Sequence, residues 1–236
     1  LKLLPFLFIF LSAHAGEKIL FIGNSYTGQI RNTVTELFKQ EKADATLTFI
    51  SPGGKTLKFH SENKDTEKII KTGNWDRIIL QDQSQTPALP GYNKIFHTAT
   101  DDFAKLFKSL KKKPQVYLYM TWGRRDGDNR NKKLFPNFTA MQKALTDNYT
   151  KAAKKIKATL LPVGLTFKEI HDSQPDLFKG LYKNDGSHPA TTGAYLAAST
   201  FYSTFYKKDP TSIAWKGNID DKTAKILLQA VKKIVK

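Results

Sequence analysis

The sequence predicts a single α/β domain, a three-layer α/β/α sandwich with a parallel sheet of about five strands. The chain has 236 residues, enough for one well-packed domain and short for two. Hydrophobic residues make up 40% of it, with 16 Phe and 9 Tyr, so it can bury a core and lacks the composition of a disordered chain. Short apolar runs alternate with segments of helical spacing, and this alternation favours right-handed crossovers between parallel strands.

Five apolar runs, each bounded by polar residues, glycine or proline, are the predicted strands. They are residues 18–23 (KILFIG), 46–51 (TLTFIS), 76–81 (DRIILQ), 115–120 (QVYLYM) and 159–163 (TLLPV). Helical spacing predicts helices over residues 30–42, 57–71, 98–112, 138–157, 190–206 and 220–235. Ligands of such sheets bind at the carboxyl ends of the strands, so functional residues are expected there.

The N-terminal residues 1–15 (LKLLPFLFIFLSAHA) have the features of a cleavable signal peptide. A basic residue precedes an apolar stretch, and Ala13-His14-Ala15 has the small-x-small pattern of a cleavage site. The stretch is shorter than the roughly 18–20 residues of a membrane span, and no later segment is long and apolar enough to cross. We expect cleavage after Ala15, a domain over residues 16–236 and a secreted or periplasmic protein. A buried N-terminal strand or helix and a membrane anchor are the alternatives.

Charge and the lack of cysteine narrow the classes of function. There is no cysteine, which excludes disulfides, thiolate metal sites and a cysteine nucleophile. The 38 Lys+Arg and 21 Asp+Glu give a net charge of +17, which favours anionic partners. Only five of the basic residues are arginines, and no zinc-finger, RNP or KH signature is present. We therefore expect no specific nucleic-acid binding.

A serine follows the first predicted strand, in Gly23-Asn24-Ser25-Tyr26-Thr27-Gly28. A serine at a strand-to-helix turn can present its hydroxyl and backbone N–H groups beside the positive end of a helix. Alternatively, Ser25 or Thr27 only caps the following helix. The GxSxG and Walker GxxxxGK[ST] motifs are absent, so α/β-hydrolase and P-loop interpretations lose support.

Two more loops follow predicted strands with residue types that suit an oxyanion hole. In Ser51-Pro52-Gly53-Gly54-Lys55-Thr56, the paired glycines allow a close backbone approach, although an ordinary turn explains them equally well. In Gln81-Asp82-Gln83-Ser84-Gln85, side-chain amides could donate to a developing negative charge. Polar residues are common in loops, so a role in loop structure is the alternative.

An Asp-x-x-His pattern lies near the C-terminus, in Asn184-Asp185-Gly186-Ser187-His188-Pro189. This spacing lets the Asp185 carboxylate hold one ring nitrogen of His188, which leaves the other free to take a proton from a serine. A metal pair is less favoured because no third ligand has suitable spacing. Asp185 as a turn residue beside a surface His188 is the other alternative. His60, His97 and His171 lack this context, and surface or helix-end positions are expected for them.

The loop after the fourth predicted strand holds three of the five arginines, in residues 121–130 (TWGRRDGDNR). Arg124 and Arg125 could bind an anionic group of a substrate, with Trp122 as a stacking surface for a sugar ring. Alternatively, the two arginines pair with Asp126 and Asp128 and only order the loop.

The order of these motifs along the chain resembles that of the SGNH/GDSL hydrolase superfamily. Its members have a flavodoxin-like α/β/α fold and act as serine esterases, lipases or carbohydrate-ester hydrolases. The resemblance implies that Ser25 is the nucleophile, with Asp185 orienting His188 as the general base. It also implies an oxyanion hole formed by the N–H groups of Ser25 and Gly54 and by Gln83. Two departures occur: Asn24 replaces the usual Asp, and Gln83 replaces an Asn, so that Gln81 or Gln85 could serve instead.

The function implied by the resemblance is hydrolysis of an ester through an acyl-serine, without a metal or organic cofactor. The basic charge favours an acylated anionic glycan that carries a short acyl group, so the expected partner is a small-molecule or polysaccharide ester. A lipase, an acyltransferase with the same triad and a non-catalytic polyanion-binding protein on this fold are the alternatives.

Overall fold

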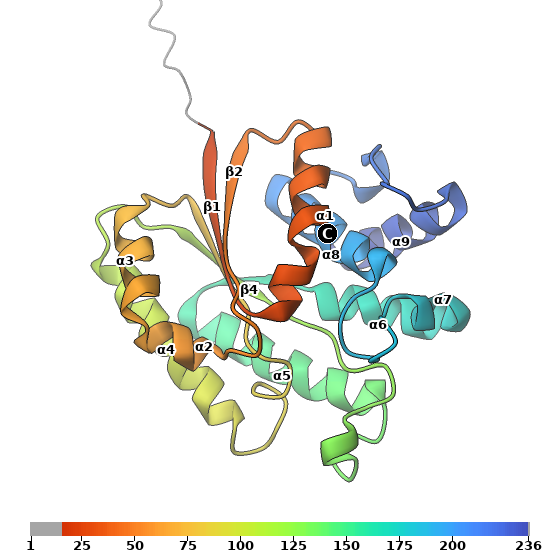
Figure 1. The fold of residues 1–236 in the computed structure, drawn as a ribbon, viewed down its shortest axis with the longest axis horizontal. Coiled ribbons are helices and arrows are strands. Elements are labelled where there is room, and N and C mark those ends of the chain that lie inside the picture. Colours follow the sequence, from red (N-terminus) through yellow and green to blue (C-terminus); the bar gives the residue numbers. More distant parts are fainter. Residues whose placement is uncertain (1–15, 236) are drawn as a thin grey trace, which may run out of the picture.

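The computed structural model describes residues 16–235, and its centre is a five-stranded parallel sheet with strand order β2-β1-β3-β4-β5 (Figure 1). The strands are β1 (Glu17–Ile22), β2 (Ala45–Ile50), β3 (Arg77–Leu80), β4 (Gln115–Tyr119) and β5 (Thr159–Leu161). Each lies within one or two residues of a predicted strand, so the predicted parallel sheet is confirmed. The winding reverses between β1 and β3, and the crevice at their carboxyl ends is where this topology places ligands.

Helices cover both faces of the sheet. They are α1 (Ser25–Gln40), α2 (Leu57–Glu62), α3 (Lys64–Thr72), α4 (Asn93–Ser109), α5 (Phe138–Ile156), α6 (Val163–Ser173), α7 (Pro175–Gly180), α8 (Thr191–Tyr206) and α9 (Asp221–Ile234). Side chains of a strand alternate between the faces, so Ile19 and Phe21 of β1 pack with α1, α6, α8 and α9. Leu20 and Ile22 pack with the cluster under α3, α4 and α5. The predicted three-layer sandwich is therefore confirmed.

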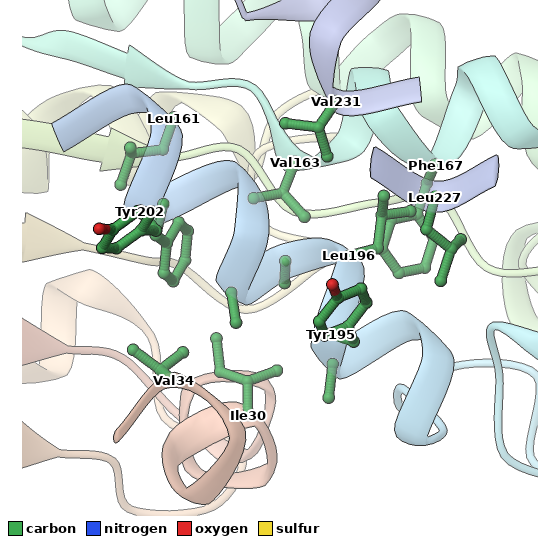
Figure 2. Packing of buried hydrophobic residues seen from close by; sticks show 14 of the residues in the cluster. Ile30, Val34, Leu161, Val163, Phe167, Tyr195, Leu196, Tyr202, Leu227 and Val231 are labelled. Carbon is green, nitrogen blue, oxygen red and sulfur yellow. The ribbon is translucent and has the colours of Figure 1, made fainter. Parts of the chain in front are cut away.

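Helix α8 is buried between its neighbours. Figure 2 shows Ile30 and Val34 of α1 on one side of it, with Val163 of α6 and Val231 of α9 on the other. Twelve of its sixteen residues are buried, as expected of a helix that is apolar all round. Because α8 directly follows the Asp-x-x-His segment, that segment is attached to one of the most enclosed elements of the domain.

Helices α1 and α4 each begin five residues before the predicted helices, and in two other places the helices differ in more than a boundary. The helix predicted over residues 57–71 is divided at Asn63, whose side chain accepts a hydrogen bond from the Thr66 N–H at 2.8 Å and caps α3. Residues 163–180 form α6 and α7, where no helix was predicted. The signal for α6 was its apolar spacing: Val163, Phe167 and Ile170 are all buried on one face.

The predicted signal peptide, residues 1–15, lies outside the described residues. Among the helices of residues 16–235, none has both the length and the apolar character that crossing a membrane requires.

Candidate active site

The nucleophile turn connects β1 to α1. Ser25 is the first residue of α1, and Asn24 caps the helix by accepting a hydrogen bond from the Tyr26 N–H at 3.1 Å. Gly23 has no space for a side chain, because a Cβ there would clash with the Thr27 hydroxyl and with Gln81. The turn therefore places the partly exposed Ser25 hydroxyl at a helix N-terminus, where partial positive charge gathers.

Ser25, His188 and Asp185 form a continuous hydrogen-bonded chain. The Ser25 hydroxyl lies 2.9 Å from His188 Nε2, and His188 Nδ1 lies 2.6 Å from Asp185 Oδ2. A carboxylate only accepts hydrogen bonds, so Nδ1 carries the proton and Nε2 accepts from the serine. The structure brings together all three residues that the sequence analysis assigned to the triad, over 163 positions of chain.

The Asp185 carboxylate is held in its ionised form. Burial raises its pKa, but hydrogen bonds from the His188 ring and from the backbone N–H groups of Ser187 and His188 outweigh burial and bring the pKa to about 2. Both of those N–H groups donate to Oδ1 at 2.9 Å. Asp185 therefore stays charged at neutral pH and fixes the tautomer of the imidazole.

The His188 turn is attached to the β4 loop and to α1. Arg125 donates its backbone N–H to the Gly186 carbonyl at 2.8 Å, and Trp122 Nε1 donates to the Ser187 carbonyl at 2.9 Å. The Tyr26 hydroxyl lies 2.7 Å from the Ser187 hydroxyl. The residue after the nucleophile therefore contacts the residue before the base.

Trp122 was predicted to offer its ring to a sugar, and this prediction is wrong. Its relative exposure is 0%, and its ring is stacked between Tyr26, with centroids 5.0 Å apart, and Phe167, with centroids 4.2 Å apart. The tryptophan of the arginine loop, which suggested a surface platform, instead belongs to the core behind the triad.

The predicted oxyanion loop after β2 is connected to the nucleophile turn. The Asn24 side chain donates from Nδ2 to the Lys55 carbonyl at 2.9 Å, next to Gly54. Gly54 has a φ of +70°, a conformation that favours glycine, and lies on the surface. The loop then enters α2, where the Leu57 N–H donates to Asp82 Oδ1 at 3.0 Å.

All three glutamines after β3 make structural contacts, and Gln83 Oε1 accepts from the backbone N–H groups of Gln85 at 2.7 Å and Thr86 at 3.2 Å. Gln81 is fully buried, and its Oε1 accepts from the Asn24 N–H at 2.9 Å and from the Thr27 hydroxyl at 2.8 Å. Gln85 Nε2 donates to Asp128 Oδ2 at 2.6 Å. Gln83 is partly exposed, and its Nε2 makes one long contact, 3.2 Å from Gln85 Oε1, which leaves a second hydrogen. Gln83 thus keeps a donor, and its assignment to the oxyanion hole stays a prediction.

Asp82 is a site residue that sequence reasoning did not assign. It is fully buried, and its Oδ1 accepts from the Leu57 and Gln83 N–H groups, at 3.0 and 2.6 Å, so it joins the two predicted oxyanion loops. Its Oδ2 is buried with no hydrogen-bond partner in residues 16–235. Burial raises its pKa to about 7, although both N–H groups lower it. A carboxyl group directly after an apolar strand was the available signal.

His60 lies in the last turn of α2, one of its two predicted positions, but it is not on the surface. Its relative exposure is 1%, and its Nε2 donates to the Gly23 carbonyl at 2.8 Å, so the ring supports the nucleophile turn from α2. Burial lowers its pKa, although the bond to Gly23 raises it, and the ring is neutral. Separately, residues 16–235 contain no group of three or more His, Asp or Glu side chains that could hold a metal ion.

In the arginine loop, Arg124 and Arg125 pair with aspartates of the same loop, as the alternative interpretation predicted. Arg124 Nη1 donates to Asp128 Oδ1 at 2.9 Å, and Arg125 Nη2 donates to Asp126 Oδ2 at 2.7 Å. Burial raises the pKa of Asp128, but hydrogen bonds from Gln85 and Asn131 and the charge of Arg124 bring it below its usual value. The two arginines order their own loop, and their contacts with a substrate stay a prediction.

The comparisons with known proteins concern the fold. No protein-family model matches the sequence, and no curated protein matches it. A DUF4886 family protein from Bacteroides uniformis is 20% identical, with a TM-score of 0.77 over 93% of this chain and 95% of that one. A candidate SGNH hydrolase from Slackia heliotrinireducens is 24% identical, with a TM-score of 0.67 over 80% of this chain and 99% of that one.

A third similar structure is that of a catalytic mutant of an acetylxylan esterase from Geobacillus stearothermophilus. It is 15% identical, with a TM-score of 0.58 over 79% of this chain and 93% of that one. The three likenesses cover 93%, 80% and 79% of this chain. Together with the parallel sheet, they show that this chain has the fold of the SGNH hydrolases.

Proposed function

We propose that the protein is a serine esterase that removes a short acyl group from a carbohydrate. The observation that carries the proposal is the chain of hydrogen bonds from Ser25 to His188, 2.9 Å, and from His188 to Asp185, 2.6 Å, at the carboxyl ends of the strands. A hydroxyl is a weak nucleophile until a base takes its proton, and this arrangement supplies the base and its orienting carboxylate.

In the first half of the proposed reaction, Ser25 Oγ attacks the ester carbonyl carbon while His188 Nε2 takes the serine proton. The carbonyl π electrons move to oxygen and form a tetrahedral oxyanion. When it collapses, the bond to the sugar oxygen breaks, and His188 gives its proton to that oxygen. The products are a free sugar hydroxyl and an acyl-serine.

In the second half, His188 takes a proton from water, and the resulting hydroxide oxygen attacks the acyl carbon. The bond between that carbon and Ser25 Oγ then breaks, and the proton returns to the serine. In each half Asp185 accepts a hydrogen bond from the Nδ1–H of His188 and stabilises the imidazolium. Its pKa of about 2 keeps it ionised throughout.

The proposed oxyanion hole combines three donors, which are the backbone N–H groups of Ser25 and Gly54 and the Gln83 amide. The contacts of Asn24 with Lys55, and of Asp82 with Leu57 and Gln83, hold the three segments together. Donors fixed before the reaction stabilise the oxyanion without reorganisation, and the loss of one costs on the order of 10²–10³ in rate.

Two observations support a carbohydrate ester as the substrate. Solved structures of this fold include acetylxylan esterases, and the net charge of +17 favours an anionic polymer. Export from the cytoplasm, proposed from residues 1–15, agrees with a substrate outside the cell. A glycan with acyl groups and acidic sugars fits all of these features.

The test compares the wild type with Ser25→Ala on a short aryl acetate. We expect loss of turnover in the variant with an unchanged circular dichroism spectrum. Ser173→Ala is the matched control, because Ser173 is exposed at the end of α6 and bonds only to the Glu169 carbonyl. Mass spectrometry of the rapidly quenched wild type should show an acyl adduct on Ser25.

Two outcomes would contradict the esterase. If the acyl group passes to an added sugar and not to water, the protein is an acyltransferase. If neither folded protein forms an adduct or turns over aryl acetate or acetylated glycan, the fold serves binding without catalysis.

A further inference from the structure

A groove of about 710 Å³ lies at the opposite end of the sheet from Ser25. Its floor includes Arg77, Gln115 and Thr159, the first residues of β3, β4 and β5. Its walls include Phe107 near the end of α4 and Phe205 near the end of α8. The groove therefore lies where helices end and strands begin, apart from the triad.

Five cationic side chains line the groove, which are Arg77, Lys108, Lys113, Lys157 and Lys207. No carboxylate lines it. Arg77 is compensated by Glu17, at 2.7 Å. Lys113 donates to the Lys108 carbonyl at 2.6 Å. The side chains of the other three lysines are exposed and make no ion pair within residues 16–235, so their positive charge faces the groove uncompensated.

Two of these lysines occupy positions where glycine is conformationally easier. Lys157 follows α5 with a φ of +57°, and Lys207 follows α8 with a φ of +51°. Residues other than glycine are disfavoured in this region. Neutralisation of the helix dipole does not require Lys157, because Lys154 and Lys155 already lie in the last turn of α5. Both of these strained positions therefore carry a positive charge at the mouth of the groove.

We propose that this groove, formed by the amino ends of β3–β5 and the ends of α4, α5 and α8, binds a segment of an acidic polysaccharide. Carboxylates along the glycan would lie near Lys108, Lys157 and Lys207. Lysine ammonium groups are hydrated point charges on flexible stems, which suit a repeating array of carboxylates without a fixed geometry.

The described surface favours a glycan over a membrane or a nucleic acid. The exposed large hydrophobic side chains all lie outside the groove: Phe59, Ile69, Tyr92, Ile95 and Leu134. A membrane would need such side chains here for insertion. The groove aromatics Phe107, Tyr117 and Phe205 are buried, so they offer no platform for unstacked bases.

The groove would bind the same polymer that the triad deacylates. This connection between groove and triad is the one part of the proposal that rests on the proposed esterase function. The six residues of β1 span roughly 20 Å, so one long chain could occupy both ends of the domain. A chain held in the groove has a raised effective concentration at Ser25. The groove would thus favour polymers over short fragments as substrates.

The test measures the binding of polygalacturonate by calorimetry in a Ser25→Ala background, so that no ester is consumed. The groove variant is Lys108→Gln with Lys157→Gly. The matched control is Lys39→Gln with Lys42→Gly: Lys39 is in the last turn of α1, and Lys42 has a φ of +54° beside β2 at the other edge of the sheet. Both variants lose two charges, and glycine relieves strain in each.

We expect the groove variant to bind roughly tenfold more weakly and the control within about threefold of the parent. Adding Lys207→Gly should weaken binding further. Equal losses in both variants would overturn the proposal in favour of diffuse attraction. It is also overturned if the parent does not bind polygalacturonate. The same holds if the protein binds phosphatidylglycerol vesicles or duplex DNA more tightly than polygalacturonate and this binding depends on the same lysines.

Activity measurements distinguish the proposed polysaccharide groove from the proposed esterase function. The groove variant with Ser25 restored should hydrolyse an aryl acetate at the wild-type rate and show a raised KM only for an acetylated acidic polymer. If Ser25 proves inactive while polygalacturonate binding still depends on Lys108 and Lys157, the groove stands and the esterase function falls.

Discussion

The Asn24 side chain donates a hydrogen bond from Nδ2 to the Lys55 carbonyl at 2.9 Å, while its Oδ1 accepts one from the Tyr26 N–H at 3.1 Å. An aspartate at this position could make only the second bond, because a carboxylate has no donor. Asn24, where the resembling SGNH/GDSL motif usually has Asp, therefore has a structural role: the amide attaches the loop of Gly54 to the nucleophile turn.

Asn24→Asp should lower kcat about tenfold or more on an aryl acetate, because a carboxylate oxygen would face the Lys55 carbonyl and displace the Gly54 loop. Asn24→Ser, which keeps a cap acceptor but is too short to reach Lys55, should cause a smaller loss. Steady-state kinetics of both variants test this. Wild-type kcat in the aspartate variant would show that the Lys55 contact does not position the loop.

Gln83→Ala should lower kcat by on the order of 10²–10³ with little change in KM, because an oxyanion donor acts mainly in the transition state. Gln85→Ala is the comparison, since the Gln85 amide is bonded to Asp128 at 2.6 Å and a smaller effect is expected. Initial rates over a range of substrate concentrations separate the two parameters. A larger fall for Gln85 than for Gln83 would reassign the donor.

Asp185→Asn should reduce kcat by on the order of 10⁴, because an amide at this position favours the wrong imidazole tautomer. With a pKa of about 2, Asp185 stays ionised above pH 4 and does not limit wild-type activity there. A protonated imidazole cannot take the serine proton, so the rate should instead be lost in acid through the base. Rates that stay level down to pH 4 would argue against His188 as the base.

Asp82→Asn should remove a pH dependence of stability. The pKa of Asp82 is raised to about 7 by burial, so the folded state binds a proton that the unfolded state releases. Stability is therefore fully present below about pH 4 and falls as pH rises to about 7, by up to several kcal/mol. Asparagine resembles the protonated carboxyl, so the variant should be less sensitive to pH in this range.

Urea unfolding of wild type and Asp82→Asn at pH 5 and pH 8 measures this difference. The variant should gain stability relative to wild type at pH 8. The same change between the two pH values in both proteins would mean that Asp82 titrates at its ordinary value in the folded state.

The strands and the triad were predictable from local patterns. Buried parallel strands are nearly continuous apolar runs, and the motif at Ser25 and that at Asp185 and His188 each lie within a few residues. Helix α6 was missed because it begins two residues after the end of β5, so Val163 was assigned to the predicted strand. Periodicity over the next seven residues would have separated the two.

The direction of a side chain at the end of a strand was not predictable. Trp122 and Gln81 both follow strands and have polar neighbours in the sequence. Both are buried nevertheless, because each fills space between elements that are distant in the sequence. The same holds for Asp82, whose partners Leu57 and Gln83 belong to two different loops. Burial of this kind depends on packing between loops.

The stack of Tyr26, Trp122 and Phe167 lies behind the triad, and two of its rings contact Ser187, through the Tyr26 hydroxyl and the Trp122 indole. The spacing of Ser25 and His188 is thus set from the interior, by groups that no substrate reaches. Exposed side chains of the loop after β4, such as Leu134, have no part in that spacing. Rim loops could therefore diverge among related proteins, changing which ester is accepted, while the reacting atoms keep their separation.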